Sequence, residues 1–199
     1  AFVIQNSSNI YIKDLNIAYV NYAYTRTTGL NGAIAIYNDN KDYATENILI
    51  DKVNISDSGI GIRLYQSTGS GKVTQNITIR NSKISYTRGH AIIGYQAPSK
   101  DGSGNYIEGV KRINLHNNNI SFGNYWPTGE SGYSNNANMI WFQYLREIIM
   151  TDNIVSNSAH NGIEIHASGN MNSLVLNNIF ENNCRSGSDC GGFKVFAGN

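Results

Sequence analysis

The sequence carries little charge and almost no net charge. Only 15% of its residues are Asp, Glu, Lys or Arg, and the formal net charge at pH 7 is +1. Proteins that bind nucleic acid or anionic membranes usually show a strong basic excess. We therefore expect neither nucleic acid nor membrane as a partner.

Cysteine and long apolar runs are also scarce. No apolar run approaches the roughly 20 residues of a transmembrane helix, and no signal peptide is visible. The two cysteines, Cys184 and Cys190, flank a short segment that a disulfide could close, which weakly favours a secreted or cell-surface protein. Two free thiols are the alternative. No Cys or His pair stands at metal-ligand spacing, so we expect no metal site.

Tyrosine and glycine are plentiful, with 13 and 20 copies, which is typical of a β-rich protein with many turns. The length suits a single domain over residues 1–199. Because the sequence begins and stops on strand-like segments, we expect a fragment of a longer chain.

One strand-like pattern recurs down the chain. Its copies are residues 33–38, 61–66, 91–96, 139–144, 162–167 and 192–197. The second and fourth positions are apolar nearly everywhere, which predicts a strand with one buried face. The third and fifth positions are then predicted to face solvent in two files: Ala35, Arg63, Ile93, Trp141, Glu164 and Lys194, and Tyr37, Tyr65, Tyr95, Gln143, His166 and Phe196.

A second pattern alternates with the first, starting at Asn9, Asn47, Asn76, Arg112, Glu147 and Ser173, about every 26 to 38 residues. An Asx residue follows each copy, which predicts a repeated tight turn at Asp14, Asp51, Asn81, Asn117, Asp152 and Asn178. A short third strand comes next. Three strands per repeat predict an all-β right-handed parallel β-helix of about six coils, with three strands per coil.

The order G-I-x-I followed by N-I-x-I-x-N-N-x-I resembles the repeats of the pectin-lyase-like superfamily of right-handed β-helices. Members include polysaccharide lyases, glycoside hydrolases, epimerases and tailspikes. The resemblance covers nearly the whole chain and implies a polysaccharide groove along the first-strand sheet. It is specific for fold rather than reaction.

Candidate substrate-binding residues lie on or beside the two predicted files. Tyr65, Tyr95 and Trp141 could stack on sugar rings, or could form a ladder that only stabilises the sheet. Arg63 and His90 could meet an acidic sugar. The remaining candidates are Gln143, Trp126 and His160.

Glu164, His166 and Lys194 form the densest ionisable group in the files, and an ion pair between Glu164 and Lys194 is the structural alternative to a catalytic role. Residues 191–195 are similar to the segment with the catalytic lysine in one family of pectate lyases. The resemblance implies Lys194 as the catalytic lysine. The functional interpretation of the group itself takes Lys194 as the proton abstractor and His166 as its partner or as a proton donor. The same family binds calcium through an Asp cluster that is not found here, so calcium rests on resemblance alone and no cofactor is evident.

The favoured function is cleavage of a polysaccharide, with β-elimination on a uronic-acid polymer slightly ahead. Hydrolysis needs two carboxyl groups about 5 to 9.5 Å apart, and Glu164 with Asp189 is the best pair. His160 falls in register with Asp189, whose alternative role is a loop cap. A third possibility is a non-catalytic glycan-binding adhesin or tailspike module. The oligomeric state is left open by the sequence.

Overall fold

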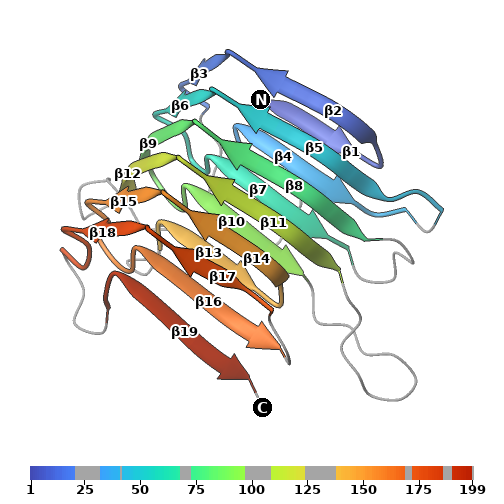
Figure 1. The fold of residues 1–199 in the computed structure, drawn as a ribbon. Coiled ribbons are helices and arrows are strands. Elements are labelled where there is room, and N and C mark those ends of the chain that lie inside the picture. The colour runs from blue at the N-terminus through green and yellow to red at the C-terminus, as the bar shows by residue number, and fades with distance from the viewer. Residues whose placement is uncertain are drawn as a thin grey trace, which may run out of the picture.

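The computed structural model describes residues 1–20, 32–40, 42–67, 73–96, 109–123, 138–168, 172–185 and 190–198. These residues form strands, turns and bends without a helix, so none of them forms a helix long and apolar enough to cross a membrane. All strand pairs are parallel, and they build three sheets that run the length of the molecule (Figure 1). The chain is a right-handed parallel β-helix, as the sequence predicts.

The first-strand sheet has seven strands, one from each successive coil. They are β1 (Phe2–Gln5), β4 (Ile34–Asn38), β7 (Ile62–Gln66), β10 (Ile92–Gln96), β13 (Ile140–Gln143), β16 (Ile163–Ser168) and β19 (Phe193–Gly198). The copies of the first sequence pattern correspond to β4, β7, β10, β13, β16 and β19.

The other two sheets have six strands each. The second-strand sheet contains β2 (Ser8–Lys13), β5 (Thr45–Asp51), β8 (Thr74–Arg80), β11 (Val110–His116), β14 (Arg146–Thr151) and β17 (Leu174–Leu176). The third-strand sheet contains β3 (Asn16–Ala18), β6 (Asn54–Ser56), β9 (Lys83–Thr87), β12 (Asn119–Gly123), β15 (Ile154–Ser156) and β18 (Ile179–Glu181). The described residues thus form six three-stranded coils plus the first strand of a seventh.

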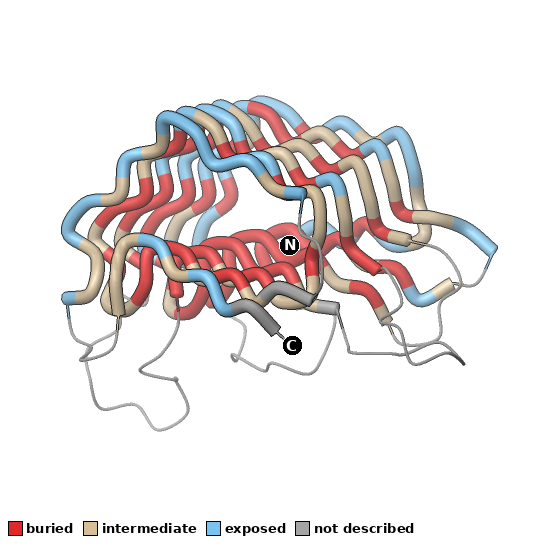
Figure 2. Tube along the Cα trace, turned by 60° about the horizontal axis from the view of Figure 1, so that its bottom comes forward, coloured by how far each residue is buried: buried red, intermediate tan, exposed pale blue. Residues whose placement is uncertain are grey.

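The core is a set of apolar columns inside the solenoid. Inward residues of each strand pair with those of the next coil, so that Ile36 lies over Leu64 and Ile50 over Ile79. Buried segments therefore recur at the same places in successive coils (Figure 2). Where the column reaches Gly94, a Cβ atom would come within 2.7 Å of the Phe142 ring, so the missing side chain provides the room for that ring.

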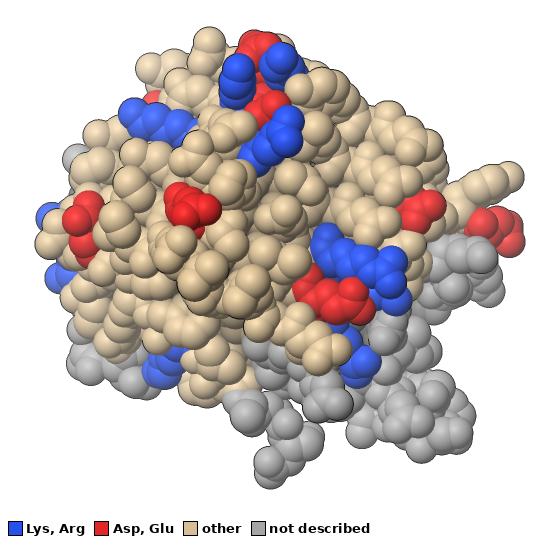
Figure 3. All heavy atoms as spheres, viewed as in Figure 1, with Lys and Arg blue, Asp and Glu red and all other residues tan. Residues whose placement is uncertain are grey.

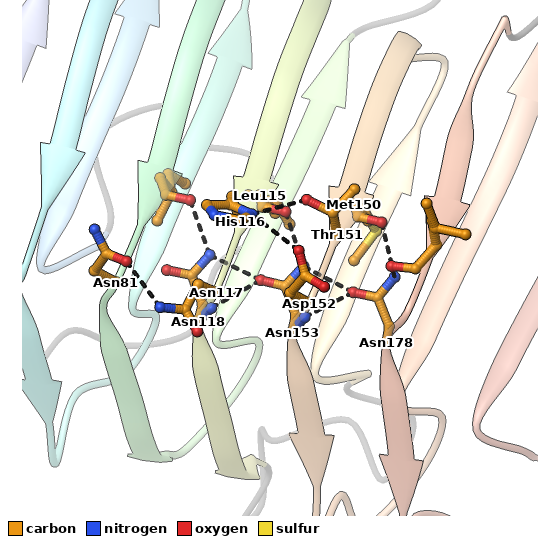
Figure 4. Close-up of polar contacts among 12 residues, drawn as sticks. Asn81, Leu115, His116, Asn117, Asn118, Met150, Thr151, Asp152, Asn153 and Asn178 are labelled. Atoms are coloured by element: carbon orange, nitrogen blue, oxygen red, sulfur yellow. Dashed lines mark hydrogen bonds and ion pairs between the residues drawn. The ribbon is translucent and has the colours of Figure 1, made fainter.

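A buried asparagine ladder runs along the turn between the second and third strands (Figure 4). Each side chain reaches back one coil: Asn118 Oδ1 accepts from the Ser82 amide at 3.0 Å, and Asn153 Oδ1 accepts from the Asn118 amide at 3.0 Å. The Asn118 and Asn153 side-chain amides donate to the Ile79 and Leu115 carbonyls, both at 2.8 Å. Asn178 repeats the pattern in the next coil, where its Oδ1 accepts from the Asn153 amide and its Nδ2 donates to the Met150 carbonyl. The ladder pairs backbone groups that the turn removes from the sheets.

Two of the predicted turn residues are not the left-handed residue of their turn. The left-handed residue of this turn is Lys52 in the second coil and Asn177 in the sixth, rather than Asp51 and Asn178. Asp51 is the last residue of β5 and pairs with Arg80, whereas Asn178 belongs to the buried ladder. The sixth copy of the second pattern is also shifted by one residue, because Val175 pairs with the inward Met150. Asp14, Asn81, Asn117 and Asp152 do have positive φ, as predicted.

Replacement of a ladder asparagine tests its contribution to stability. Asn118→Ala would leave the buried Ser82 amide without its acceptor, so we expect the free energy of unfolding to fall by about 3 kcal/mol. The neighbouring Asn119→Ala, at an exposed strand position, should change it by less than about 0.5 kcal/mol. Urea denaturation measures both, and equal effects of the two variants would contradict a structural role for the ladder.

Acidic and basic side chains lie side by side on the face seen in Figure 3. One ion pair of the second-strand sheet is that of Asp51, whose carboxylate accepts from Arg80 at 3.0 Å and from Asn81 at 2.9 Å. The hydrogen bond from Arg80, supported by Asn81, lowers the pKa of Asp51 from 3.8 to about 2. The contribution of Asp51 to stability is therefore present above about pH 4 and is lost as the pH falls through about 2.

Asp51→Asn should reduce this acid sensitivity. We expect the wild-type free energy of unfolding to decline between about pH 4 and pH 2 more steeply than that of the variant, because only the wild type takes up this proton on unfolding. The exposed Asp42→Asn serves as control and should retain the wild-type slope. Urea denaturation across this pH range measures the slopes, and parallel curves for wild type and Asp51→Asn would rule out the linkage.

Candidate functional site

The two predicted files on the first-strand sheet are confirmed residue by residue. Arg63 pairs with Ile93, which pairs with Trp141, and the file continues through Glu164 to Lys194. In the fifth-position file, Tyr65 pairs with Tyr95, and Gln143 pairs with His166. Ring contacts between Trp141 and both Tyr95 and His166 show that the two files share one face.

The predicted exposure of the third-position file is wrong in its first half. Arg63 is completely buried, with 0% of its surface exposed, and Ala35 and Ile93 are buried too. One cause is the chain entering β4: a Cβ atom on Gly32 would lie 3.5 Å from the Arg63 Cβ. The Arg63 guanidinium carbon sits 5.5 Å from the Tyr65 ring centroid. Arg63 therefore does not face solvent as a partner for an acidic sugar.

The tyrosines form a ladder of stacked rings. The centroids of Tyr37 and Tyr65 are 5.2 Å apart with ring planes 8° from parallel, and those of Tyr65 and Tyr95 are 5.9 Å apart at 15°. Trp141 continues the stack 6.2 Å from Tyr95. Since Tyr65 has a ring against each face, neither face is open to a sugar, and this geometry favours the structural alternative. Burial raises the pKa of the Tyr65 hydroxyl, which stays protonated.

Two predicted histidines gather around Asn138, just before β13. His90 is buried, its ring stacks on Trp141, and its Nδ1 lies 2.7 Å from the Asn138 carbonyl oxygen. The expectation that His90 reaches out to substrate is therefore wrong, because the turn before β10 folds its ring against the sheet. His160 is half-buried, with Nδ1 2.8 Å from Asn138 Oδ1.

Glu164 and His166 form a hydrogen-bonded pair on β16. His166 Nε2 lies 2.5 Å from Glu164 Oε1, and the side chains are 33% and 13% exposed. The second carboxylate oxygen of Glu164 accepts from Asn161 Nδ2 at 2.6 Å. A carboxylate acceptor on Nε2 leaves Nδ1 of neutral His166 as a proton acceptor. These two hydrogen bonds hold the Glu164–His166 pair in one orientation.

Lys194 and Phe196 border this pair on β19. The Phe196 ring stacks on the His166 ring at 4.7 Å, and Lys194 Nζ lies 4.8 Å from the Phe196 centroid. The register also places Lys194 directly beside Glu164. A cation, an imidazole and a carboxylate therefore lie together at the partly exposed end of the two files. We call Glu164, His166, Lys194, Phe196 and Trp141 the β16–β19 site.

Some predicted residues lie outside the described part of the chain, namely Asp189 and Trp126.

The disulfide between Cys184 and Cys190 is present. No group of three or more His, Cys, Asp or Glu residues able to hold a metal forms among the described residues.

Two asparagines that sequence reasoning missed connect the site. Asn138 and Asn161 are both buried, and Asn161 Nδ2 lies 3.0 Å from Asn138 Oδ1. Asn161 precedes a copy of the first pattern by one residue, which is a signal for a turn. The abundance of turn asparagines hides its special contact with Glu164.

No protein-family model and no curated protein matches this chain. Among solved structures it is similar to the enzymatically active domain of bacteriophage CBA120 tailspike protein 2, with a TM-score of 0.51, 13% identity, and coverage of 98% of this chain and 35% of that one. It is also similar to full-length tailspike protein 2 from an Escherichia coli O157:H7 bacteriophage, with a TM-score of 0.52 and 12% identity. That match covers 98% of this chain and 28% of the tailspike chain. A third similar structure is the A-module of the Azotobacter vinelandii mannuronan C-5 epimerase AlgE4, with a TM-score of 0.51 and 14% identity. That match covers 99% of this chain and 54% of the epimerase module.

These likenesses confirm the fold that the repeats predict. The chain spans about a third to a half of the length of the solved chains it matches. At such low identity the shared feature is the parallel β-helix itself.

The tyrosine ladder can be tested by its effect on stability. Tyr65→Leu removes two ring stacks, each worth about 0.5 to 1.5 kcal/mol, so the free energy of unfolding should fall by about 1 to 3 kcal/mol. Tyr65→Phe keeps the rings and should stay within about 0.5 kcal/mol of wild type. Denaturation curves provide the measurement. A fully stable Tyr65→Leu variant that lost glycan binding would instead support a sugar platform.

Proposed function

We propose that this chain processes a polysaccharide bound along the first-strand sheet, and that the β16–β19 site abstracts the C5 proton of a uronic-acid residue. The observation that carries the proposal is the hydrogen bond between His166 Nε2 and Glu164 Oε1 at 2.5 Å. It gives a partly exposed histidine one defined orientation and one available nitrogen, which suits general-base catalysis.

His166 is a better base in this arrangement than Lys194. An ammonium group has donors but no acceptor, whereas the imidazole keeps Nδ1 as an acceptor when its Nε2–H is donated to Glu164. Lys194 then offsets the negative charge that develops on the uronate carboxylate as the C5 proton leaves. The two roles expected from the sequence are therefore reversed in this proposal: His166 is the base, and Lys194 is its partner. Arg63 takes no part, because it is buried.

The proposed elimination breaks one C–H bond and one C–O bond. His166 Nδ1 takes the C5 proton, the C5–H electrons form the C4–C5 double bond, and the bond from C4 to the glycosidic oxygen breaks. The departing oxygen takes up a proton, either from the imidazolium or from water. Return of a proton to the opposite face of C5 would instead invert that carbon without cleavage. Both outcomes share the abstraction step, and no step passes through a metal ion.

Hydrolysis has less support from the described residues. It needs an acid and a second carboxylate across the bond, but both oxygens of Glu164 already accept hydrogen bonds. The other predicted member, Asp189, lies outside the described residues. A purely glycan-binding module is the remaining alternative.

The solved neighbours support a polysaccharide partner by analogy of fold, because one is a mannuronan C-5 epimerase module and another is an enzymatically active tailspike domain. The disulfide suits an oxidising compartment, so we propose that the chain acts outside the cytoplasm, in a secreted or surface setting.

The test is a panel of acidic and neutral polysaccharides incubated with the protein and with His166→Ala. We expect new ultraviolet absorbance from an unsaturated product on a uronic-acid polymer, and a loss of rate of about 10²- to 10⁴-fold in His166→Ala. His116→Ala is the matched control: it removes an exposed histidine from the second-strand sheet and should retain wild-type activity.

Other products would point elsewhere. Deuterium uptake from D₂O at C5 without cleavage would indicate epimerisation by the same base. New reducing ends without the absorbance change would favour hydrolysis. Binding to a glycan that is never altered would leave the non-catalytic module, and full activity of His166→Ala would remove His166 from the mechanism.

A further inference from the structure

Asn161 has a fully occupied side chain in the turn before β16. Its Nδ2 donates to Glu164 Oε2 at 2.6 Å and to Asn138 Oδ1 at 3.0 Å, and its Oδ1 accepts from the Gly191 amide at 2.8 Å. The residue is completely buried, so water does not substitute for these partners. Each of these contacts links the β16–β19 site to a different part of the chain.

The amide of Asn161 can adopt only one of its two flipped orientations. A flip would aim Oδ1 at the Glu164 carboxylate and Nδ2 at the Gly191 N–H, placing acceptor against acceptor and donor against donor. The observed orientation is therefore imposed by its neighbours. It ties Oε2 of Glu164 to the turn and leaves Oε1 for His166.

The disulfide holds the other side of this arrangement. Cys184 donates its amide to the His160 carbonyl at 2.8 Å, and Gly191, next to Cys190, accepts from the Gly162 amide at 3.0 Å. The covalent bond between Cys184 and Cys190 therefore clamps residues on both flanks of the 160–162 turn. Gly191 in turn supplies the donor that fixes the Asn161 amide.

We infer that Asn161 is a positioning residue for the Glu164–His166 pair, and that the Cys184–Cys190 disulfide keeps Asn161 in place. The catalytic consequence rests on the proposed function, whereas the positioning itself does not. Asn161 keeps one carboxylate oxygen engaged so that the other meets His166 Nε2 in a single geometry. The disulfide thus supports the site from outside, through the 160–162 turn, and touches neither Glu164 nor His166 in the described contacts.

The experiment follows the His166 Nε2 proton by NMR in protein labelled with ¹⁵N-histidine, without any substrate. The hydrogen bond to Glu164 should protect this proton from exchange with water, and Glu164→Ala should abolish the protection. His166→Gln assigns the signal among the four histidines. Exchange in Asn161→Ala should be about tenfold faster than in wild type, the factor that one lost hydrogen bond allows.

The matched control is Asn153→Ala, which removes an equally buried asparagine from the ladder between the second and third strands and should leave the exchange rate unchanged. Asn161→Ser replaces Asn161→Ala if the latter does not fold. The double variant Cys184→Ser/Cys190→Ser should also accelerate exchange, by less than Asn161→Ala.

Wild-type exchange in Asn161→Ala, or equal acceleration in Asn153→Ala, would overturn the positioning role. An unchanged rate in the double serine variant would overturn the part played by the disulfide. If the exchange results hold while no polysaccharide is altered, the proposed function fails and the positioning of His166 stands.

Discussion

The structure depends on one constraint, which is that each residue of a strand lies beside its equivalent in the next coil. Parallel hydrogen bonding fixes this register at about 4.8 Å between strands, so side chains form columns instead of scattered contacts. The same position in successive coils therefore has the same surroundings and needs a similar residue. Inward positions hold Ile, Leu and Phe, and the turn between the second and third strands holds asparagines that bond to the preceding coil.

The same constraint decides which residues can meet a ligand. In the first coils the outward columns hold tyrosine rings that stack on one another and an arginine that is buried. The ring faces and the guanidinium group are therefore covered by other protein atoms. The pattern changes where Gln143 interrupts the fifth-position file. Beyond it, the two files carry Glu164, His166 and Lys194, which stay partly exposed, and Phe196 stacks on His166. The candidate chemistry lies at this end of the files, and not among the stacked tyrosines.

The β16–β19 site is held mainly by turns and by residues far apart in sequence. Asn138 and Gly191, from the coils on either side, both bond to the Asn161 side chain, which donates to the Glu164 carboxylate. The strands supply the spacing between Glu164 and His166, while the buried turn asparagines supply the orientation. A rigid scaffold with specific turns is a common basis for a functional site.

The sequence by itself determined the β-helix, the three-strand coil and the pairing of residues along both files, because a period of two and a recurring coil are local patterns. It misplaced Asp51 because the left-handed position of that coil holds Lys52 instead of an Asx residue, and it misplaced Asn178 because its neighbour Asn177 is also an Asx residue. Only the tertiary structure decided which outward residues are covered. The burial of Arg63 and His90, the stacked faces of the tyrosines and the contact of Asn161 with Glu164 arise between coils, where side-chain direction and neighbouring turns set the outcome.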